Sequence, residues 1–457
     1  MEKWLASTGK PFWSKFFNLA LPVSLQSMMF AALGMFDVMM VASLGNAEIA
    51  AVGLGGKVFF FNLLTVFGIS GAINILGAQY YGAGEPEGIR KILVQSIIWA
   101  LLINGIFALF YTLNPSFFVA LSSEDPQLIE LGATYLQITG WTILITAIIV
   151  PLESALRVNN DVMAPTVIGV LAIIINVIFN IILIFGAGPI EAMGVAGAAW
   201  ATVIGRLSQL IIMMLYIKYK RRAILPSSEE IKEALKKSEM FKFMKFVFPI
   251  LFQHAGWALG ILVYSLIIAT MGTEALAIHS LVAPIEGVFL SAFFGLSSAC
   301  GIMVGHELGA NKFERAWYQS WTAVYTGVFL ALSTAALLAV NQYYLLAFLQ
   351  QHAFENSQLI VNVSLVLALG LSLKVHNMMG INGVLKSGGD IKYSAFIDLF
   401  GLWIIGIPAA ILSAIVWQWP LHWVLLMMLS EEIVKSILTI QRMIKKRWLI
   451  NLVTKDG

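Results

Sequence analysis

The residues of this chain that could do chemistry are ionisable side chains inside otherwise apolar segments. Asp37 stands in the first long apolar run, between Phe36 and Val38. An ionised carboxylate in hydrocarbon costs about 2.5–3.5 kcal/mol on insertion scales, so it either has a partner or works by gaining and losing charge. No metal-ligand cluster, nucleophile motif or phosphate-binding loop is visible in the sequence. We therefore expect no enzyme activity, no resident metal and no cofactor.

Amides and a hydroxyl are expected at the depth of this carboxylate. At 1.5 Å per residue, Asp37 and Asn180 each lie about 10 Å from the outer end of their predicted spans, and Thr202 lies about 12 Å into its own. Asn176 is one turn from Asn180 on the same helical face. A carboxylate ringed by amide and hydroxyl oxygens can hold a proton or a small hard cation. We predict that these four residues form one coupling site; a permanent polar clip between helices is the alternative.

Other ionisable residues of the N-terminal half need partners of their own. Lys57 is either the counter-ion of Asp37 or points outward. Arg206 stands in the middle of an apolar segment and must have a partner. Glu153 and Arg157, four residues apart, indicate a salt bridge more than a site, although a role in binding stays open.

The elements that carry these residues are membrane-spanning helices. The chain has 457 residues, of which 59% are hydrophobic and 12% are charged. A helix needs about 20 apolar residues to cross a bilayer, and we predict twelve such spans. They lie near 16–43, 51–80, 92–114, 130–155, 163–187, 194–217, 244–271, 278–305, 316–340, 357–385, 393–416 and 421–441.

The distribution of Lys and Arg predicts the orientation of these spans. The loops 44–50, 115–129, 188–193, 272–277, 341–356 and 417–420 contain neither residue, whereas the loops on the other side are rich in both. Both termini are therefore expected in the cytoplasm, with the chain in the plasma membrane, the inner membrane of a bacterium. The net charge of +3 reflects this asymmetry, and we expect no nucleic acid partner.

An internal repeat divides the chain into two halves. Residues 21–91 align with 248–318 at a constant offset of 227, which places Pro22 on Pro249. Six spans in each half make the repeat parallel, so the fold class is an all-α membrane protein with two six-helix lobes. A pseudo-two-fold axis along the membrane normal would relate the lobes across a central cleft.

The predicted boundaries are an N-terminal lobe at 1–217, a cytoplasmic linker at 218–243 and a C-terminal lobe at 244–457. The linker should hold a short amphipathic helix opened by a capping box of Ser227 and Glu230. Two parallel lobes with a cleft are an architecture for alternating access, which favours a transporter over a channel. Without a nucleotide-binding domain, its energy must come from an ion gradient.

The C-terminal half carries a different set of polar candidates. Tyr264 occupies the repeat position of Asp37, so the halves differ chemically. Glu286 and His376 are possible secondary polar sites, although a lone histidine in a helix is more often only hydrogen-bonded. Trp257 could belong to a polarisable wall that receives flat cationic molecules, or it could simply be a packing residue.

At these motifs the chain resembles the multidrug and toxic compound extrusion (MATE) family over nearly its full length. The resemblance rests on Pro22 fifteen residues before Asp37, on the runs Gly82-Ala83-Gly84 and Gly309-Ala310-Asn311, and on Gly383-Val-Leu-Lys-Ser-Gly-Gly-Asp390. It implies an antiporter that exports amphipathic, often cationic compounds in exchange for H⁺ or Na⁺.

The resemblance also assigns roles to single residues. It implies that Asp37 is the coupling carboxylate and that Asn176 and Thr202 belong to its polar network. The family often has Asp where this chain has Asn180, which weakens the case for Na⁺. The acids that sodium-coupled NorM-like members use in spans seven and ten are replaced by Trp257 and Val375. The chain is therefore more similar to the DinF-like branch, and we expect protons.

Other readings remain open. A flippase for a lipid-linked headgroup would need a strongly basic cleft, but Lys57, Arg206 and Lys374 are scattered among acids. A scaffold or sensor that transports nothing is a different class. We expect a monomer in the lipid bilayer whose partners are small molecules.

Overall fold

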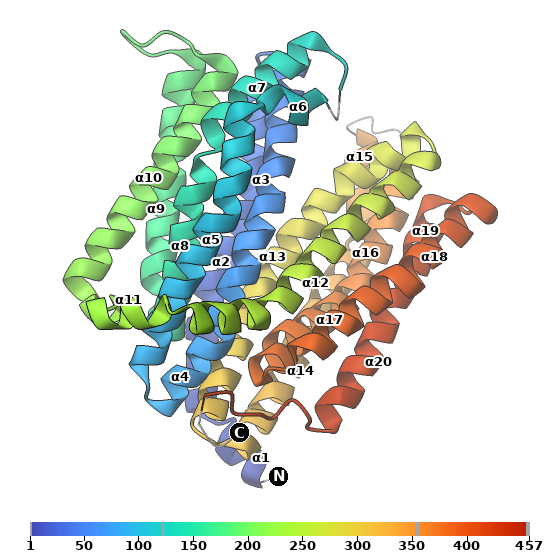
Figure 1. Ribbon diagram of the computed structural model, residues 1–457. Coiled ribbons are helices and arrows are strands. Elements are labelled where there is room, and N and C mark those ends of the chain that lie inside the picture. Colours follow the sequence, from blue (N-terminus) through green and yellow to red (C-terminus); the bar gives the residue numbers. More distant parts are fainter. Residues whose placement is uncertain (1, 121–122, 352–355, 454–457) are drawn as a thin grey trace. The chain divides into compact units, whose positions relative to one another are not determined.

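The computed structural model describes residues 2–120, 123–351 and 356–453 and is almost entirely helical (Figure 1). Within these ranges there is no β-strand, and an isolated bridge joins Ala187 to Ile190. The chain folds into two compact units. One unit is residues 25–251, and the other combines residues 1–24 with residues 252–457. The lobe boundaries expected from the sequence stay predictions.

Two long helices contribute residues to both units. Helix α2 (Lys10–Val41) passes from one unit to the other after Ser24, and α12 (Lys237–Thr270) does so after Leu251. Each contains a proline two residues before its crossing point, Pro22 in α2 and Pro249 in α12. Proline removes one backbone hydrogen bond and crowds the preceding turn, so each crossing coincides with a weak point of its helix.

Among its described residues, the unit of residues 25–251 contains nine complete α-helices besides parts of α2 and α12. These are α3 (Asn46–Ala72), α4 (Ala78–Ala83), α5 (Pro86–Leu113), α6 (Pro115–Ala120), α7 (Pro126–Thr139), α8 (Thr142–Val158), α9 (Met163–Phe185) and α10 (Gly194–Lys220), followed by the short α11 (Ser228–Ala234). A π-helical turn at Ile73–Gly77 joins α3 to α4. Helices α9 and α10 lie side by side, as do α5 and α8 (Figure 1).

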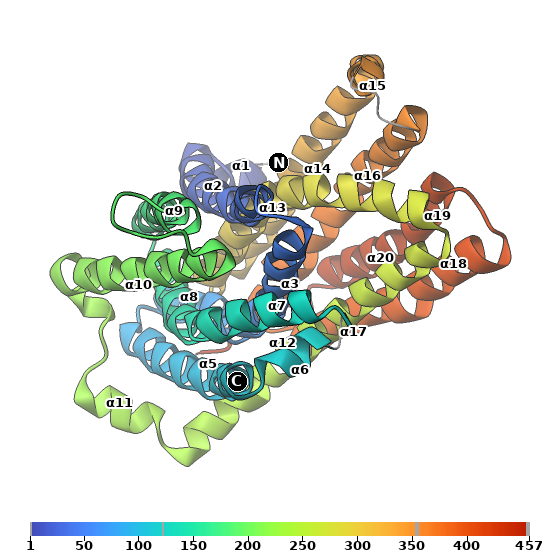
Figure 2. The ribbon, with the colours of Figure 1, turned by 90° about the horizontal axis from the view of Figure 1, so that it is seen from above.

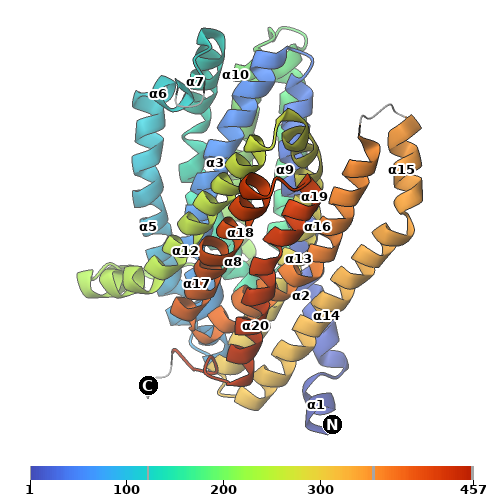
Figure 3. The same cartoon turned by 90° about the vertical axis from the view of Figure 1, so that its right-hand side faces the viewer.

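The other unit is built around α13 and α14. It contains α1 (Glu2–Ser7), α13 (Thr273–Gly309), α14 (Phe313–Val340), α15 (Gln342–Gln351), α16 (Ser357–Asn377), α17 (Ile391–Phe400), α18 (Ile407–Ile411), α19 (Leu421–Met428) and α20 (Ser430–Ile444). π-Helical stretches at Met378–Leu385, Gly401–Gly406 and Leu412–Val416 continue α16, α17 and α18. Figure 3 shows α14 beside α16 and α20 beside the continuation of α17.

The helices have the lengths and apolar character of membrane spans. Among the described residues, ten helices are long and apolar enough to cross a membrane, and a bent pair makes eleven. That pair is α7 and α8, which meet at 44° around Gly140, so the predicted fourth span at 130–155 is broken rather than straight. The stretch from α19 to α20 corresponds to the twelfth predicted span, and its charged residues make it more polar than the others.

The turns that end the first helical pair of each repeat have the same backbone conformation. Gly84 adopts a φ of 77° after α4, and Asn311 adopts a φ of 57° after α13. These two residues are related by the repeat offset of 227. Glycine and asparagine are the residues that tolerate this left-handed conformation best. Each half of the repeat therefore has a suitable residue at the same position of the turn.

Helix α11 is attached to its own unit by a buried ion pair. Ser227 and Glu230 form a capping box, and the helix ends at Ala234. Glu230 is 8% exposed and accepts hydrogen bonds from Arg90 of α5 at 2.6 and 2.9 Å. The bond from the Arg90 guanidinium holds the pKa of the Glu230 carboxyl at about 2, well below its usual range. Figure 2 shows α11 at the edge of this unit, beyond α5 and α10.

Candidate functional site

Asp37 is held by amide groups of α9. The Asn180 side chain donates to Asp37 Oδ1 at 2.7 Å and also lies 3.2 Å from the Asn176 oxygen. Both asparagines are buried, Asn180 completely. Because they lie four residues apart in α9, their amides stack on one helical face and point toward the end of α2. The structure thus brings together three of the four residues predicted to form the coupling site.

The depth of this layer differs slightly from the expectation. Helix α2 ends at Val41, so Asp37 lies about 6 Å from the helix end rather than about 10 Å. Helix α9 ends at Phe185, which places Asn180 at a similar level, about 7 Å from its end. The two groups still match in height because both helices end earlier than predicted.

Thr202 of α10 is connected to Asp37 and the two asparagines through an aromatic neighbour, Tyr135. The Thr202 hydroxyl donates to the backbone oxygen of Ala198 at 3.1 Å and also contacts Tyr135 of α7. The Tyr135 side chain is 7% exposed, and its hydroxyl interacts electrostatically with the Asp37 carboxylate. Gly55 of α3 makes room for this ring, since a Cβ atom at that position would overlap it. Tyr135 is therefore a member of the site that sequence reasoning missed.

Arg206 has partners of two kinds. Its Nη1 donates to Gln209 Oε1 at 3.0 Å, and its guanidinium lies over the rings of Phe30 and Phe59, 5.2 and 5.7 Å from their centroids. The predicted need for a partner is met by these neutral groups.

Glu153 is the centre of a second buried network in this unit. It is 5% exposed and accepts from Arg157 at 3.0 Å, from Gln26 at 2.9 Å and from Gln209 at 3.1 Å. Arg157 also donates to Gln26 at 2.8 Å. The salt bridge favoured by the sequence is present, and two glutamines complete it.

Lys57 does not accompany Asp37. Its side chain is exposed, and within the described ranges of the chain no ion pair joins it to any carboxylate. Of the two alternatives for Lys57, the structure agrees with the outward one and contradicts the counter-ion. The reason is geometric. Gly55 is buried, and Lys57, two residues further along α3, lies on the opposite face of the helix.

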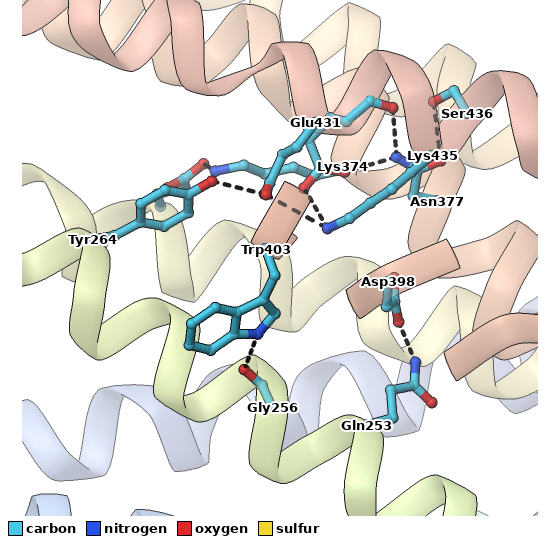
Figure 4. A network of polar contacts seen from close by, with 12 residues as sticks. Gln253, Gly256, Tyr264, Lys374, Asn377, Asp398, Trp403, Glu431, Lys435 and Ser436 are labelled. Carbon is cyan, nitrogen blue, oxygen red and sulfur yellow. Dashed lines mark hydrogen bonds and ion pairs between the residues drawn. The ribbon is translucent and has the colours of Figure 1, made fainter. Parts of the chain in front are cut away.

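The other unit contains a larger acid–base network, shown in Figure 4. The Tyr264 hydroxyl donates to Glu431 at 2.8 Å, and Lys435 lies 3.5 Å from Glu431 and 3.7 Å from Glu432. Asn377 donates to Glu432 at 2.7 Å. Lys435 is only 4% exposed, so two carboxylates share one buried ammonium group.

The remaining candidates of this unit lie around that network. Glu286 of α13 pairs with Lys374 of α16 at 2.5 Å, so it is occupied by an ion pair. His376 Nδ1 lies 3.3 Å from the side-chain oxygen of Asn377, whereas its Nε2 is buried without a hydrogen-bond partner. Trp257 of α12 is 37% exposed.

A carboxylate bonded by neutral amides can bind and release a proton without breaking an ion pair. Within the parts of the chain that the structure describes, no group of three or more His, Cys, Asp or Glu residues could hold a metal ion. Asp37 is bonded by a neutral amide, whereas Glu153 and Glu286 form ion pairs with Arg157 and Lys374.

Comparison with known proteins decides the family. The MatE family model matches residues 22–182 and 249–412, one segment in each half of the repeat. This chain belongs to the MatE family. The proteins of this family are transporters, which agrees with a fold of apolar helices, and the chain is an integral membrane protein.

Individual relatives of this MatE chain are distant but match over most of their length. The chain is 22% identical over 440 residues to the uncharacterized transporter YisQ of Bacillus subtilis, covering 95% of this chain and 94% of the relative. It is 23% identical over 414 residues to the probable multidrug resistance protein NorM of Synechocystis, covering 87% of each.

Solved structures show the fold. A mutant of the Vibrio cholerae MATE transporter VcmN superimposes with a TM-score of 0.85 at 18% identity, covering 96% of this chain and 98% of that one. A MOP superfamily transporter from Pyrococcus furiosus does so with a TM-score of 0.81 at 17% identity, covering 98% and 97%. The twelve-helix, two-lobe MATE fold expected from the sequence is confirmed, whereas its assignment to the DinF-like branch stays a prediction.

Proposed function

We propose that this MatE transporter is an antiporter that exports amphipathic, often cationic compounds in exchange for protons, with Asp37 as the coupling carboxylate. The observation that carries the proposal is the binding of Asp37 by the Asn180 amide at 2.7 Å. Across the described residues, no lysine, arginine or histidine forms an ion pair with Asp37. Its charge is therefore available to a proton or to cargo.

The exchange follows from the change in charge at Asp37. When the site faces the exterior, Asp37 takes up a proton, and the loss of negative charge releases a cationic cargo. When it faces the cytoplasm, Asp37 gives up the proton and binds new cargo. One elementary charge that crosses 100 mV is worth about 2.3 kcal/mol, enough to support more than a tenfold concentration ratio.

Protons are preferred to Na⁺ for a chemical reason. A sodium ion needs several oxygen ligands arranged around it. Asn180 supplies a neutral amide beside Asp37, and its free oxygen is buried without a hydrogen-bond partner. One carboxylate with two amides suits a proton better, although Na⁺ is the alternative that the experiment must test. The proposed setting is the bacterial inner membrane with both termini in the cytoplasm.

The test replaces Asp37 by Asn, which keeps its size and removes its charge. The D37N variant should reach the membrane and still fail to export ethidium, a flat amphipathic cation, from cells. Asp125→Asn is the matched control, because Asp125 is exposed and only caps the start of α7. Export by D37N at the wild-type rate would remove Asp37 from the mechanism. Ethidium uptake into inside-out vesicles under separately imposed pH and sodium gradients then identifies the coupling ion.

A further inference from the structure

Arg206 stands between the levels of two carboxylates of its unit, Asp37 and Glu153. Thr202, Arg206 and Gln209 follow each other at helical spacing on one face of α10. Thr202 belongs to the layer of Asp37, whereas Gln209 donates to Glu153 at 3.1 Å. These two levels are about 10 Å apart along the helix axis. The charge of Arg206 interacts with both Glu153 and Asp37 from its intermediate position.

The guanidinium of Arg206 is held by contacts that allow it to move. It makes one hydrogen bond to Gln209 and lies over Phe30 and Phe59. A guanidinium has five N–H donors, and in the described part of the chain none of those of Arg206 forms an ion pair. An aromatic ring attracts a cation over its face, but this attraction does not engage a particular N–H donor as a hydrogen bond does.

Arg157 shows the opposite arrangement. It is bound to Glu153 at 3.0 Å and to Gln26 at 2.8 Å, so the negative charge of Glu153 already has a fixed partner. Of the two arginines near Glu153 and Asp37, Arg157 is therefore locked in an ion pair and Arg206 is not. The charge of Arg206 remains for Asp37 whenever that residue is ionised.

The repeat provides a second example of a shared cation. The offset of 229 that relates Glu153 to Asn382 also relates Arg206 to Lys435. Lys435 lies within 4 Å of Glu431 and Glu432 at once. In the unit of Arg206 the two acids are far apart, so the same role requires the cation to divide its time between them.

We propose that Arg206 is a tethered counter-ion that moves toward Asp37 when this carboxylate is ionised and returns to the Gln209–Glu153 network when Asp37 is neutral. This inference rests on the coupling role proposed for Asp37. Arg206 is a positioning residue, because it acts through Asp37 and binds no cargo itself. Its movement keeps the interior close to neutral and sets the pH at which Asp37 gives up its proton to the cytoplasm.

The groups that face Asp37 limit what else could set this pH. Asn176 and Asn180 on α9 are neutral, and so is Thr202 on α10. Tyr135 on α7 carries a hydroxyl that is neutral near physiological pH. Glu153 and Arg157 on α8 belong to the deeper network. Arg206 is the cation whose charge acts directly on Asp37.

The experiment measures ethidium uptake into inside-out vesicles, driven by an acid lumen, as a function of the pH of the medium. The medium corresponds to the cytoplasm, where Asp37 must lose its proton to bind cargo. Removal of a neighbouring cation makes this loss harder, so R206M should move the acid limb of the profile by about one to three pH units toward alkaline pH. R206K should restore the wild-type position. R221M is the matched control, because Arg221 pairs with Asp161 outside both networks, and it should not move the limb.

A double-mutant cycle tests whether Arg206 is shared. E153Q weakens the inner partner and should move the limb toward acid pH in the wild type, because Arg206 then stays nearer Asp37. In the R206M background E153Q should cause no further shift. An R206M pH profile that superimposes on the wild-type profile would overturn the proposal. So would equal shifts by E153Q in the wild-type and R206M backgrounds.

Two controls separate this proposal from the one on which it rests. D37N should abolish uptake in every background; uptake by D37N at the wild-type rate rejects the coupling role of Asp37 itself. Inactive D37N together with an unshifted R206M profile rejects the shared counter-ion alone. Thermal melting in detergent shows which variants fold, and R206Q takes the place of R206M if that variant does not reach the membrane.

Discussion

Close packing around Tyr135 decides the shape of the polar layer at Asp37. The ring fills the space left by Gly55, and its hydroxyl contacts Thr202. A side chain at position 55 would push the ring toward the carboxylate or away from the threonine. The missing side chain of Gly55 on α3 thus determines where the Tyr135 hydroxyl of α7 lies.

Replacement of Gly55 by Ala should therefore damage the site. Overpacking of this kind typically costs about 1–3 kcal/mol, so we expect a lower melting temperature and weaker ethidium export. Gly56→Ala is the matched control, since a Cβ atom there meets nothing within 4 Å. Melting curves and export rates of the two variants check this; equal behaviour would mean that the Tyr135 ring moves aside freely.

Asp37 and Asn180 could be predicted from the sequence, whereas Tyr135 and Gln209 could not, and the difference has a physical reason. An ionised or amide side chain in an apolar run is conspicuous because its burial is costly, and depth along each helix then placed Asp37 beside Asn180. Tyr135 and Gln209 carry a weaker signal, because tyrosines are frequent at membrane interfaces and an uncharged glutamine costs less to bury than an ionised side chain. Only the packing of α7 and α10 reveals them.

At the scale of elements, α11 is fastened by one ion pair that is buried and one that is not. Arg90 binds the 8%-exposed Glu230, while Lys91 binds Glu233 at 2.7 Å with both side chains substantially exposed. Exposed ion pairs contribute little, so the first pair should hold the helix.

We predict that R90M releases α11, whereas K91M does not. Faster hydrogen exchange and faster proteolysis of residues 222–236 in R90M are the measurements. Acid should have the same effect as R90M. The depressed pKa of Glu230, about 2, gives stability that is complete above its unfolded pKa of about 4.3 and is lost as the pH falls toward 2. Release of the helix in K91M but not in R90M would reverse this assignment.

Hydropathy predicted the helices well but not their irregularities. The broken span of α7 and α8 turns at Gly140, where a Cβ atom would crowd Tyr111 and the Leu136 oxygen. Neither this bend nor the π-helical stretches beyond α16 and α17 change the average hydrophobicity of their segments. They depend on contacts with other helices, which a window along the sequence does not contain.

At the scale of the whole molecule, the two units exchange their first segments. Residues 1–24 belong with residues 252–457. They are held there by the ring of Trp4, which packs on Tyr318, and by hydrogen bonds from Gln319 to the Ser7 oxygen and from Ser24 to the Ala292 oxygen. The repeat in the sequence therefore does not coincide with the units in space.

This exchange predicts how the chain tolerates being cut. Separation in the linker between residues 225 and 226 leaves each fragment without a segment of one unit, so neither fragment alone should accumulate in a stable form. Co-expression of residues 1–225 with 226–457 should restore ethidium export. Deletion of residues 1–9 from the intact chain should lower its melting temperature. Stable accumulation of residues 226–457 alone would show that the first segment is dispensable for that unit.

Synthesis on the ribosome adds a constraint of its own. Ser24 must find a partner 268 residues further along the chain. At about 5–20 residues per second, the N-terminal half of α2 waits roughly 10–50 s before that partner is made. During this delay the nascent protein is exposed to quality-control proteases, so slow translation of the second half should reduce yield more than slow translation of the first.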